Sequence, residues 1–293
     1  MLTKEELSKI LSDGITLLDG ATGSNLRNAG MPKDCCAEQW VLENPEPLVA
    51  LQRSYAEAGS RIIYAPTFQA QPIALKAVGL ESQTERMNEA LVALSRSAAP
   101  GCLIAGDLTT LVSFCDSWDE NNFDLLVENY RRQIRGLIGG GADLLVGETL
   151  LYAQEAEAIL TAAELEGAGA VLYSFTMQPD GSLFSGADAG KILRDLEHAG
   201  AAAVGFNCVA ADGMTPYLVT KLRRQVKIPL ICKPNAGIPV INSQGQAQYA
   251  MTPPEFADIL SACAQNGATI LGGCCGTTAD HIRAVKERIL PNS

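Results

Sequence analysis

AVGFNCVAADGMTPYLVTKLRRQV, residues 203–226, contains one complete unit of the fold. Its first residues form an apolar run of the kind found in a fully buried strand, and residues 214–226 then show the spacing of a helix. A buried strand followed directly by a helix is the repeating unit of parallel α/β sheets. This stretch therefore predicts an α/β protein.

The same pattern occurs eight times in the 293 residues. The expected strands cover residues 15–19, 61–65, 103–107, 144–147, 171–176, 203–206, 230–233 and 269–272. The expected helices cover residues 46–58, 81–98, 123–139, 153–166, 187–199, 214–226, 253–266 and 279–290. Because no Gly- or Pro-rich linker divides these units, we predict one domain over residues 1–293, a closed (β/α)8 or TIM barrel. An extra helix at residues 4–11 would close the barrel bottom, and an open doubly wound sheet is the alternative.

Composition excludes several classes of function. A formal net charge of -11 and a pI near 4.7 would repel the phosphate backbone of a nucleic acid. No apolar stretch approaches the roughly 20 residues of a membrane span, and the acidic start is unlike a signal peptide. We therefore expect a cytoplasmic protein without nucleic-acid or membrane partners.

Three of the nine cysteines suggest a metal site. Cys274 and Cys275 are adjacent between glycines, and Cys208 follows an apolar run. Neighbouring thiols are too close for an ordinary disulfide, but both can bind one tetrahedral ion if the backbone turns sharply. Three cysteines without an obvious fourth ligand predict a Zn²⁺ site with one open position, as in catalytic sites. We expect Cys102, Cys232 and Cys263 in the core, and we interpret Cys35, Cys36 and Cys115 as incidental thiols.

Active sites of this barrel lie at the carboxyl ends of its strands. Cys208 follows the sixth expected strand and Cys274 and Cys275 follow the eighth, so all three should share one end. Polar residues hold the corresponding place on other strands, namely Asp19, Thr67, Asp107, Glu148 and Asn235. The two histidines, His198 and His281, fall on expected helices away from this end. A pocket with a metal on its wall is therefore predicted.

At this point the sequence resembles a known family. The segments Gly205-Phe206-Asn207-Cys208 and Gly272-Gly273-Cys274-Cys275-Gly276-Thr277-Thr278 are similar to motifs of the homocysteine S-methyltransferase family. Asp19-Gly20-Ala21-Thr22-Gly23-Ser24 and Gly147-Glu148-Thr149 resemble its loops after strands one and four. Residues 233–239, followed by Tyr249, Pro253 and Phe256, are most similar to the homocysteine-binding domain of cobalamin-dependent methionine synthase. Residues 65–68 and 106–110 depart from the usual family pattern.

The resemblance implies a zinc-dependent transfer of a methyl group to homocysteine, giving methionine. It implies Cys208, Cys274 and Cys275 as catalytic zinc ligands. Asp19 and Glu148 would bind the ammonium group of the substrate, and backbone N–H groups of Ala21, Thr22 and Gly23 its carboxylate. The remaining expected substrate contacts are Asn207 and Asn235.

The methyl donor is the more open half of this prediction. The resemblance favours methylcobalamin or another methyl-corrinoid carried by a separate partner protein. A small donor such as S-methylmethionine or betaine is the alternative. Two other readings are a non-catalytic zinc-binding component of a corrinoid system, and a zinc-free aldolase or isomerase that uses Lys233 at the end of strand seven.

Overall fold

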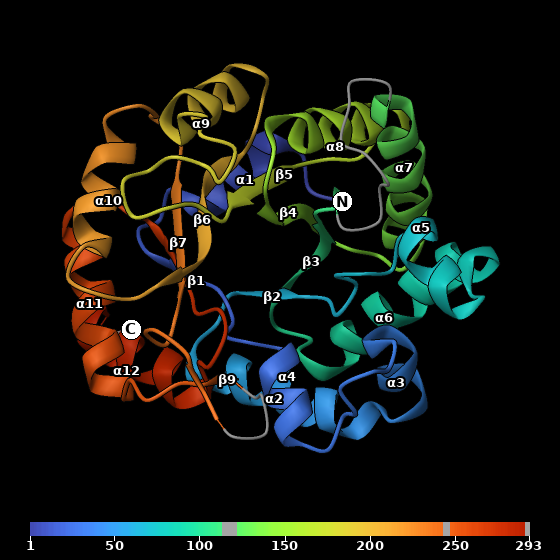
Figure 1. Ribbon diagram of the computed structural model, residues 1–293, viewed down its shortest axis with the longest axis horizontal. Coiled ribbons are helices and arrows are strands. Elements are labelled where there is room, and N and C mark those ends of the chain that lie inside the picture. Colours follow the sequence, from blue (N-terminus) through green and yellow to red (C-terminus); the bar gives the residue numbers. More distant parts are fainter. Residues whose placement is uncertain (113–121, 243–246, 291–293) are drawn as a thin grey trace.

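The computed structural model describes residues 1–112, 122–242 and 247–290, and its main feature is a ring of parallel strands (Figure 1). Eight of them form one sheet in the order β1-β10-β7-β6-β5-β4-β3-β2. They are β1 (Thr16–Leu17), β2 (Ile62–Tyr64), β3 (Leu103–Thr109), β4 (Leu144–Leu150), β5 (Val171–Phe175), β6 (Ala203–Ala210), β7 (Leu230–Asn235) and β10 (Ile270–Leu271). Each coincides with an expected strand, so the predicted (β/α)8 barrel is confirmed.

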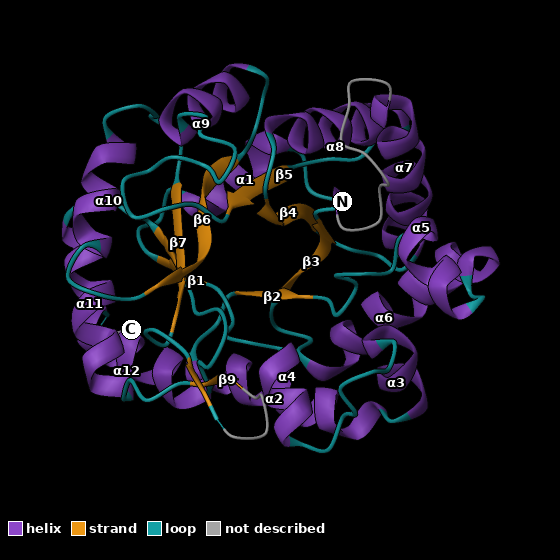
Figure 2. Cartoon of the chain, viewed as in Figure 1, coloured by secondary structure: helices purple, strands orange, loops and turns teal. Residues whose placement is uncertain are grey.

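The two ends of that strand order also meet. Leu18, just after β1, forms a parallel bridge with Ile62 of β2, and the Arg61 N–H donates to the Leu17 carbonyl at 2.8 Å. The sheet is therefore a nearly closed barrel with helices around it (Figure 2). This closure excludes the open doubly wound sheet.

Helices cover the outside of the strands. The eight that follow the strands are α4 (Pro45–Ala58), α6 (Thr84–Ala98), α7 (Phe123–Gly139), α8 (Ala153–Leu165), α9 (Ala189–His198), α10 (Thr215–Arg223), α11 (Pro253–Gln265) and α12 (Ala279–Ile289). They match the expected helices to within a few residues at each end. Additional short elements are α2 (Gly23–Asn28), α3 (Ala37–Glu43), α5 (Pro72–Leu75), the 3-10 turns η1 (Lys76–Val78) and η2 (Glu81–Gln83), and an antiparallel ribbon of β8 (Val240–Ile241) and β9 (Ala247–Gln248).

Strand residues alternate between two apolar layers. Ile62, Leu144 and Ile231 belong to the cluster inside the barrel, whereas Ile63 and Leu145 belong to the cluster between strands and helices. This alternation follows from the two-residue period of a strand. Cys102, Cys232 and Cys263 are buried, as predicted, and Cys115 lies outside the described residues.

The N-terminal segment closes the amino end of the barrel. Leu7 and Leu11 of α1 (Lys4–Leu11) are buried in the inner cluster. Leu2 donates a backbone hydrogen bond to Asp143 at 2.7 Å and accepts one from Ala170 at 2.9 Å, which ties this segment to the starts of β4 and β5. The predicted closure of the barrel bottom is thus observed.

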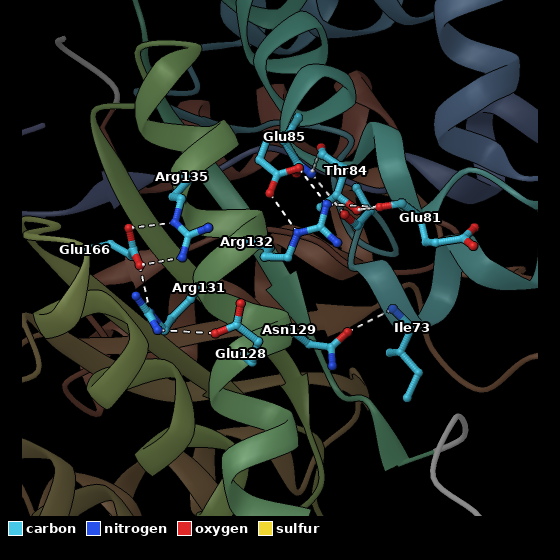
Figure 3. Close-up of polar contacts among 12 residues, drawn as sticks. Ile73, Glu81, Thr84, Glu85, Glu128, Asn129, Arg131, Arg132, Arg135 and Glu166 are labelled. Carbon is cyan, nitrogen blue, oxygen red and sulfur yellow. Dashed lines mark hydrogen bonds and ion pairs between the residues drawn. The ribbon is translucent and has the colours of Figure 1, made fainter.

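Helix α7 is held to both neighbouring helices by ion pairs (Figure 3). Arg132 makes a bidentate ion pair with Glu85 of α6, with N–O distances of 2.7 and 2.8 Å. Arg131 and Arg135 both contact Glu166 at the end of α8.

Among the described residues, no helix combines the length and the apolar character that crossing a bilayer requires.

Candidate metal centre

The structure brings Cys208, Cys274 and Cys275 together at the carboxyl end of the barrel. Cys208 lies in β6, and the pair follows β10 directly. Their three Sγ atoms all lie within 4.8 Å of one another. Tetrahedral zinc with Zn–S bonds of about 2.3 Å would place two sulfurs about 3.8 Å apart, so these three thiols fit such an ion.

The backbone around these cysteines is specialised. Cys208 has φ 58, a left-handed conformation that side chains rarely adopt, and the ladder between β6 and β7 is irregular between Asn207 and Ala210. Gly276, with φ 81, turns the chain after the cysteine pair. Cys274 N–H donates to the Pro234 carbonyl at 2.7 Å. Neighbouring strand ends therefore fix the direction of each thiol.

The thiols influence one another strongly. Hydrogen bonds from Cys208 and Cys274 lower the pKa of the Cys275 thiol to about 3, against the opposing effect of burial. The same contacts, with burial, raise the pKa of Cys208 well above its usual range. The three thiols therefore form one hydrogen-bonded group in which Cys275 is the easiest to ionise, and a thiolate is the donor that a soft metal ion prefers.

Asn207 is a fully buried connection between three strand ends. Its Oδ1 accepts hydrogen bonds from the Thr149 N–H at 3.0 Å and from the Ser174 hydroxyl at 2.6 Å. Its Nδ2 donates to Thr149 Oγ1 at 2.7 Å and lies 3.9 Å from the Cys274 sulfur. Asn235 donates to the Cys208 carbonyl at 3.2 Å. Both asparagines contact the cysteine loops and are not among the residues that line the adjacent cavity.

That cavity has a volume of about 280 Å³ and ends at the three cysteines. The other expected site residues line it together: Asp19, Ala21, Thr22, Gly23 and Glu148. One of the expected backbone donors is already engaged, because the Ala21 N–H donates to Thr277 Oγ1 at 3.1 Å.

Buried charges lie on the floor of this cavity. Lys233 Nζ is 2.9 Å from Glu148 Oε1 and 3.8 Å from Asp19 Oδ1, and it lies 4.9 Å from the centre of the Tyr64 ring. Asp107 lines the same cavity. Within the described residues, Asp107 Oδ1, Asp19 Oδ1 and the Tyr64 hydroxyl are buried without a hydrogen-bond partner. Polar atoms of this kind are expected where a ligand's polar groups bind.

Burial governs the ionisation of these groups. It raises the pKa of Asp19 to about 7, partly opposed by Lys233, and it raises the pKa of Asp107 and of Glu148. For Lys233, burial favours the neutral amine, but Glu148 and Asp19 outweigh it and raise its pKa well above the usual value. Lys233 is therefore held as a cation. An aldolase lysine must instead be an uncharged amine, so Lys233 does not fit that role.

Tyr64 and Glu38 are cavity residues that the motifs did not reveal, and Lys233, expected there only as the amine of an aldolase or isomerase, lines the cavity as an ion-pair partner. Lys233 shares its strand face with inward-pointing Ile231, so strand periodicity was an available signal. Glu38, in α3, accepts the Gln69 N–H at 2.7 Å, and nothing in the sequence indicated that contact. His281 packs against Phe256, with 5.5 Å between ring centres, and His198 is exposed, so both lie outside the site.

Comparisons with known proteins agree with this geometry. The sequence profile described as homocysteine S-methyltransferase matches residues 16–289. Methionine synthases of Mycobacterium leprae (strain TN) and Mycobacterium tuberculosis (strain ATCC 25618 / H37Rv) are 27% and 26% identical to this protein over 97% of its chain. The chain spans 25% of the length of each of these relatives. The metallated form of the homocysteine methyltransferase MmuM from Escherichia coli superimposes with a TM-score of 0.82 at 27% identity, covering 96% of this chain and 99% of that one.

Proposed function

Since the chain belongs to the homocysteine S-methyltransferase family, we propose that it is a zinc-dependent enzyme that transfers a methyl group to homocysteine, giving methionine. The observation that carries this proposal is the meeting of Cys208, Cys274 and Cys275 at the end of a cavity with buried carboxylates. Zn²⁺ bound by the three cysteines would act as a Lewis acid that lowers the pKa of an incoming thiol.

The acidic floor of the cavity binds the amino-acid end of homocysteine. Asp19 and Glu148 face the cavity and share the charge of Lys233, and Asp107 adds a third carboxylate with an unpartnered oxygen. Glu148 and Asp19 share Lys233 as their counter-charge, and the raised pKa values of Asp19 and Asp107 show that a further cation would be needed to ionise all three carboxyls together. The substrate ammonium group would be that cation. Thr22 and Gly23 line the cavity, and their backbone N–H groups would receive the substrate carboxylate.

The two buried asparagines orient the ligand loops. Asn207 accepts from the Thr149 N–H and directs its Nδ2 group at the Cys274 sulfur. Asn235 donates to the Cys208 carbonyl. These contacts keep the sulfurs aimed at the end of the cavity, where the acceptor thiol arrives. Hydrogen bonds around metal ligands commonly have this role.

A methyl-corrinoid carried by a partner protein is the proposed donor. It is favoured by the likeness of residues 233–239 to methionine synthase and by the two methionine synthases among the relatives. Ile238, Val240 and Ile241, which follow β7, are 72%, 64% and 64% exposed and offer an apolar surface to such a partner. A small donor is the second candidate, because the chain covers 99% of MmuM, a homocysteine methyltransferase of similar extent.

A donor comparison tests this proposal. Methionine formation from homocysteine is measured with a methyl-loaded corrinoid protein, free methylcobalamin, S-methylmethionine and betaine. Activity with the corrinoid donors is expected. Activity only with S-methylmethionine or betaine would replace the donor, and no methionine with any of them would contradict the acceptor as well.

Metal analysis tests the zinc ligands separately. Cys208→Ser, Cys274→Ser and Cys275→Ser should each lose bound zinc, whereas Cys35→Ser, which changes a half-buried thiol outside the cluster, should keep it. X-ray absorption at the zinc edge should change when homocysteine is added. An unchanged edge would favour a closed structural site over a catalytic one.

A further inference from the structure

Tyr249 lies directly against the cysteine pair. It follows β9, is half-buried, and its ring packs on Gly276, where an added Cβ would be only 2.2 Å from the ring Cγ. Its hydroxyl forms a hydrogen bond with the Cys275 sulfur. A phenol titrates near pH 10 in water, so at neutral pH this hydroxyl is the donor and the sulfur the acceptor.

The neighbouring sulfur has a different donor. Asn207 Oδ1 accepts from the Thr149 N–H and the Ser174 hydroxyl, which fixes the orientation of the amide. The Nδ2 group therefore faces Cys274, at 3.9 Å from its sulfur. Cys208 forms its sulfur hydrogen bonds with Cys274 and Cys275. Cys275 and Cys274 thus differ in the side chain that donates to their sulfur, a phenol hydroxyl in one case and an amide in the other.

The proposed function creates a chemical problem that this difference addresses. The reaction brings a methyl donor to a site with three protein sulfurs and one substrate sulfur, and any of them could attack. Attack by a protein sulfur would form a new S–CH₃ bond while the bond between the methyl carbon and the donor breaks, its electron pair leaving with the donor. The product would be a thioether in place of a thiolate ligand, and the site would be lost.

We propose that Tyr249 protects Cys275 from methylation by donating a hydrogen bond to its sulfur. A hydrogen bond to a thiolate stabilises the charge before the reaction, and that charge disappears as the S–C bond forms, so the bond lowers the nucleophilicity of the sulfur. This inference rests on the proposed methyl transfer. Tyr249 is a positioning residue here, since it acts through Cys275 and not on the substrate.

Alkylation by iodomethane without homocysteine tests this protection. Zinc-loaded wild type, Tyr249→Phe and the control Tyr217→Phe, whose tyrosine is 63% exposed on α10, are treated, and methylation of each cysteine is followed by peptide mass spectrometry. In Tyr249→Phe, Cys275 should be methylated about tenfold faster, the rate equivalent of one charge-assisted hydrogen bond. Cys208 and Cys274 serve as internal references and should keep their wild-type rates.

Equal rates at Cys275 in wild type and Tyr249→Phe would overturn the inference, and so would an equal rise in Tyr217→Phe. A second measurement uses Co²⁺ in place of zinc, where loss of the hydrogen bond should move the thiolate charge-transfer band to lower energy. Zinc content is measured on the same samples, and absence of zinc from the wild type would count against the proposed function. The labelling comparison tests the contact between Tyr249 and Cys275, so its result can be interpreted with or without bound zinc.

Discussion

Lys233 changes the interpretation of the two carboxylates next to it. A buried carboxylate without a counter-charge is costly, and Lys233 supplies that charge to Glu148 and Asp19 in the free protein. In the proposed function, the ammonium group of homocysteine therefore meets a site whose charge is already partly neutralised. Its affinity would depend on carboxyl groups that ionise fully only when a second cation is present.

Replacing Glu148 with Gln should therefore weaken homocysteine binding while zinc is retained. The variant removes the carboxylate of Glu148 from the cavity floor, and Lys233 keeps Asp19 as its ion-pair partner. We expect at least about a tenfold loss of affinity by calorimetry, the value of one charged hydrogen bond. Glu157→Gln, an exposed change on α8, is the control. Unchanged affinity would remove Glu148 from substrate binding.

Gly276 is required for two reasons at the residue scale. Its φ of 81 disfavours any side chain, and an added Cβ would overlap the Tyr249 ring. Gly276→Ala should lower the free energy of unfolding by about 2 kcal/mol or more in urea titrations. Gly213→Ala, where nothing lies within 4 Å of the new Cβ, should change it by less than about 0.5 kcal/mol. Equal effects would show that backbone strain at Gly276 is unimportant.

The sequence predicted individual residues unevenly. Cys208, Cys274 and Cys275 were recognisable because adjacent thiols between glycines have few structural uses, and the barrel then placed Cys208 beside them. Lys233 was named only as the amine of the alternative aldolase or isomerase, and Tyr249 only as part of the family resemblance, so their contacts in the site were not predicted. Their roles depend on contacts with Glu148 and Cys275, which come from distant segments, and no local pattern records such contacts.

At the scale of elements, buried periodic segments were predicted well. The eight barrel strands and the helices after them carry apolar residues at regular spacing, because each buries one side. The elements α2, α3 and α5 were missed, since six, seven and four residues are too few to establish a helical period. The β8–β9 ribbon was missed because its four residues are exposed and make no apolar pattern.

The ion pairs of α7 should make stability depend on acidity. Hydrogen bonds from Arg132 lower the pKa of Glu85 from its ordinary value. The ionised carboxylate therefore contributes stability above the unfolded pKa, and this contribution is lost as the pH falls through the lowered folded pKa. For a partly exposed pair we expect about 1 kcal/mol or less.

The matched variants for this prediction are Arg132→Gln and Arg86→Gln. Arg132→Gln should be less stable than wild type at pH 7, and the difference should shrink as the pH falls through the lowered pKa of Glu85, as measured by urea unfolding. Arg86 is exposed on the same helix as Glu85, and its replacement should leave the pH profile unchanged. A constant difference between Arg132→Gln and wild type at all pH values would contradict the role of this ion pair.

At the scale of the whole molecule, the family prediction is confirmed by the match over residues 16–289. The barrel and the meeting of the cysteines followed from strand order. The methyl donor could not be predicted from strand order. Recognition of a donor partner depends on exposed residues at the barrel mouth, and exposed residues lack the apolar spacing that marks buried segments.

Zinc should stabilise the entire barrel. Its proposed ligands join β6 to the segment after β10, and a ligand that binds only the folded state adds about 2.7 kcal/mol at 100 times its Kd. For a protein of this size that corresponds to a Tm increase of about 4 °C. Calorimetry with zinc or with a chelator should detect this shift in wild type and in Cys35→Ser. An equal shift in Cys208→Ser would place the zinc elsewhere.

The closed amino end of the barrel has a consequence for kinetics. Because α1 fills that end with Leu7 and Leu11, the two substrates share a single approach, from the carboxyl end. The carboxylates proposed for the acceptor are nearly fully buried, whereas the cysteines above them are half-buried, so a donor seated first would block the way. Turnover should therefore follow a compulsory order, with homocysteine first on and methionine last off, and methionine should inhibit competitively against homocysteine alone.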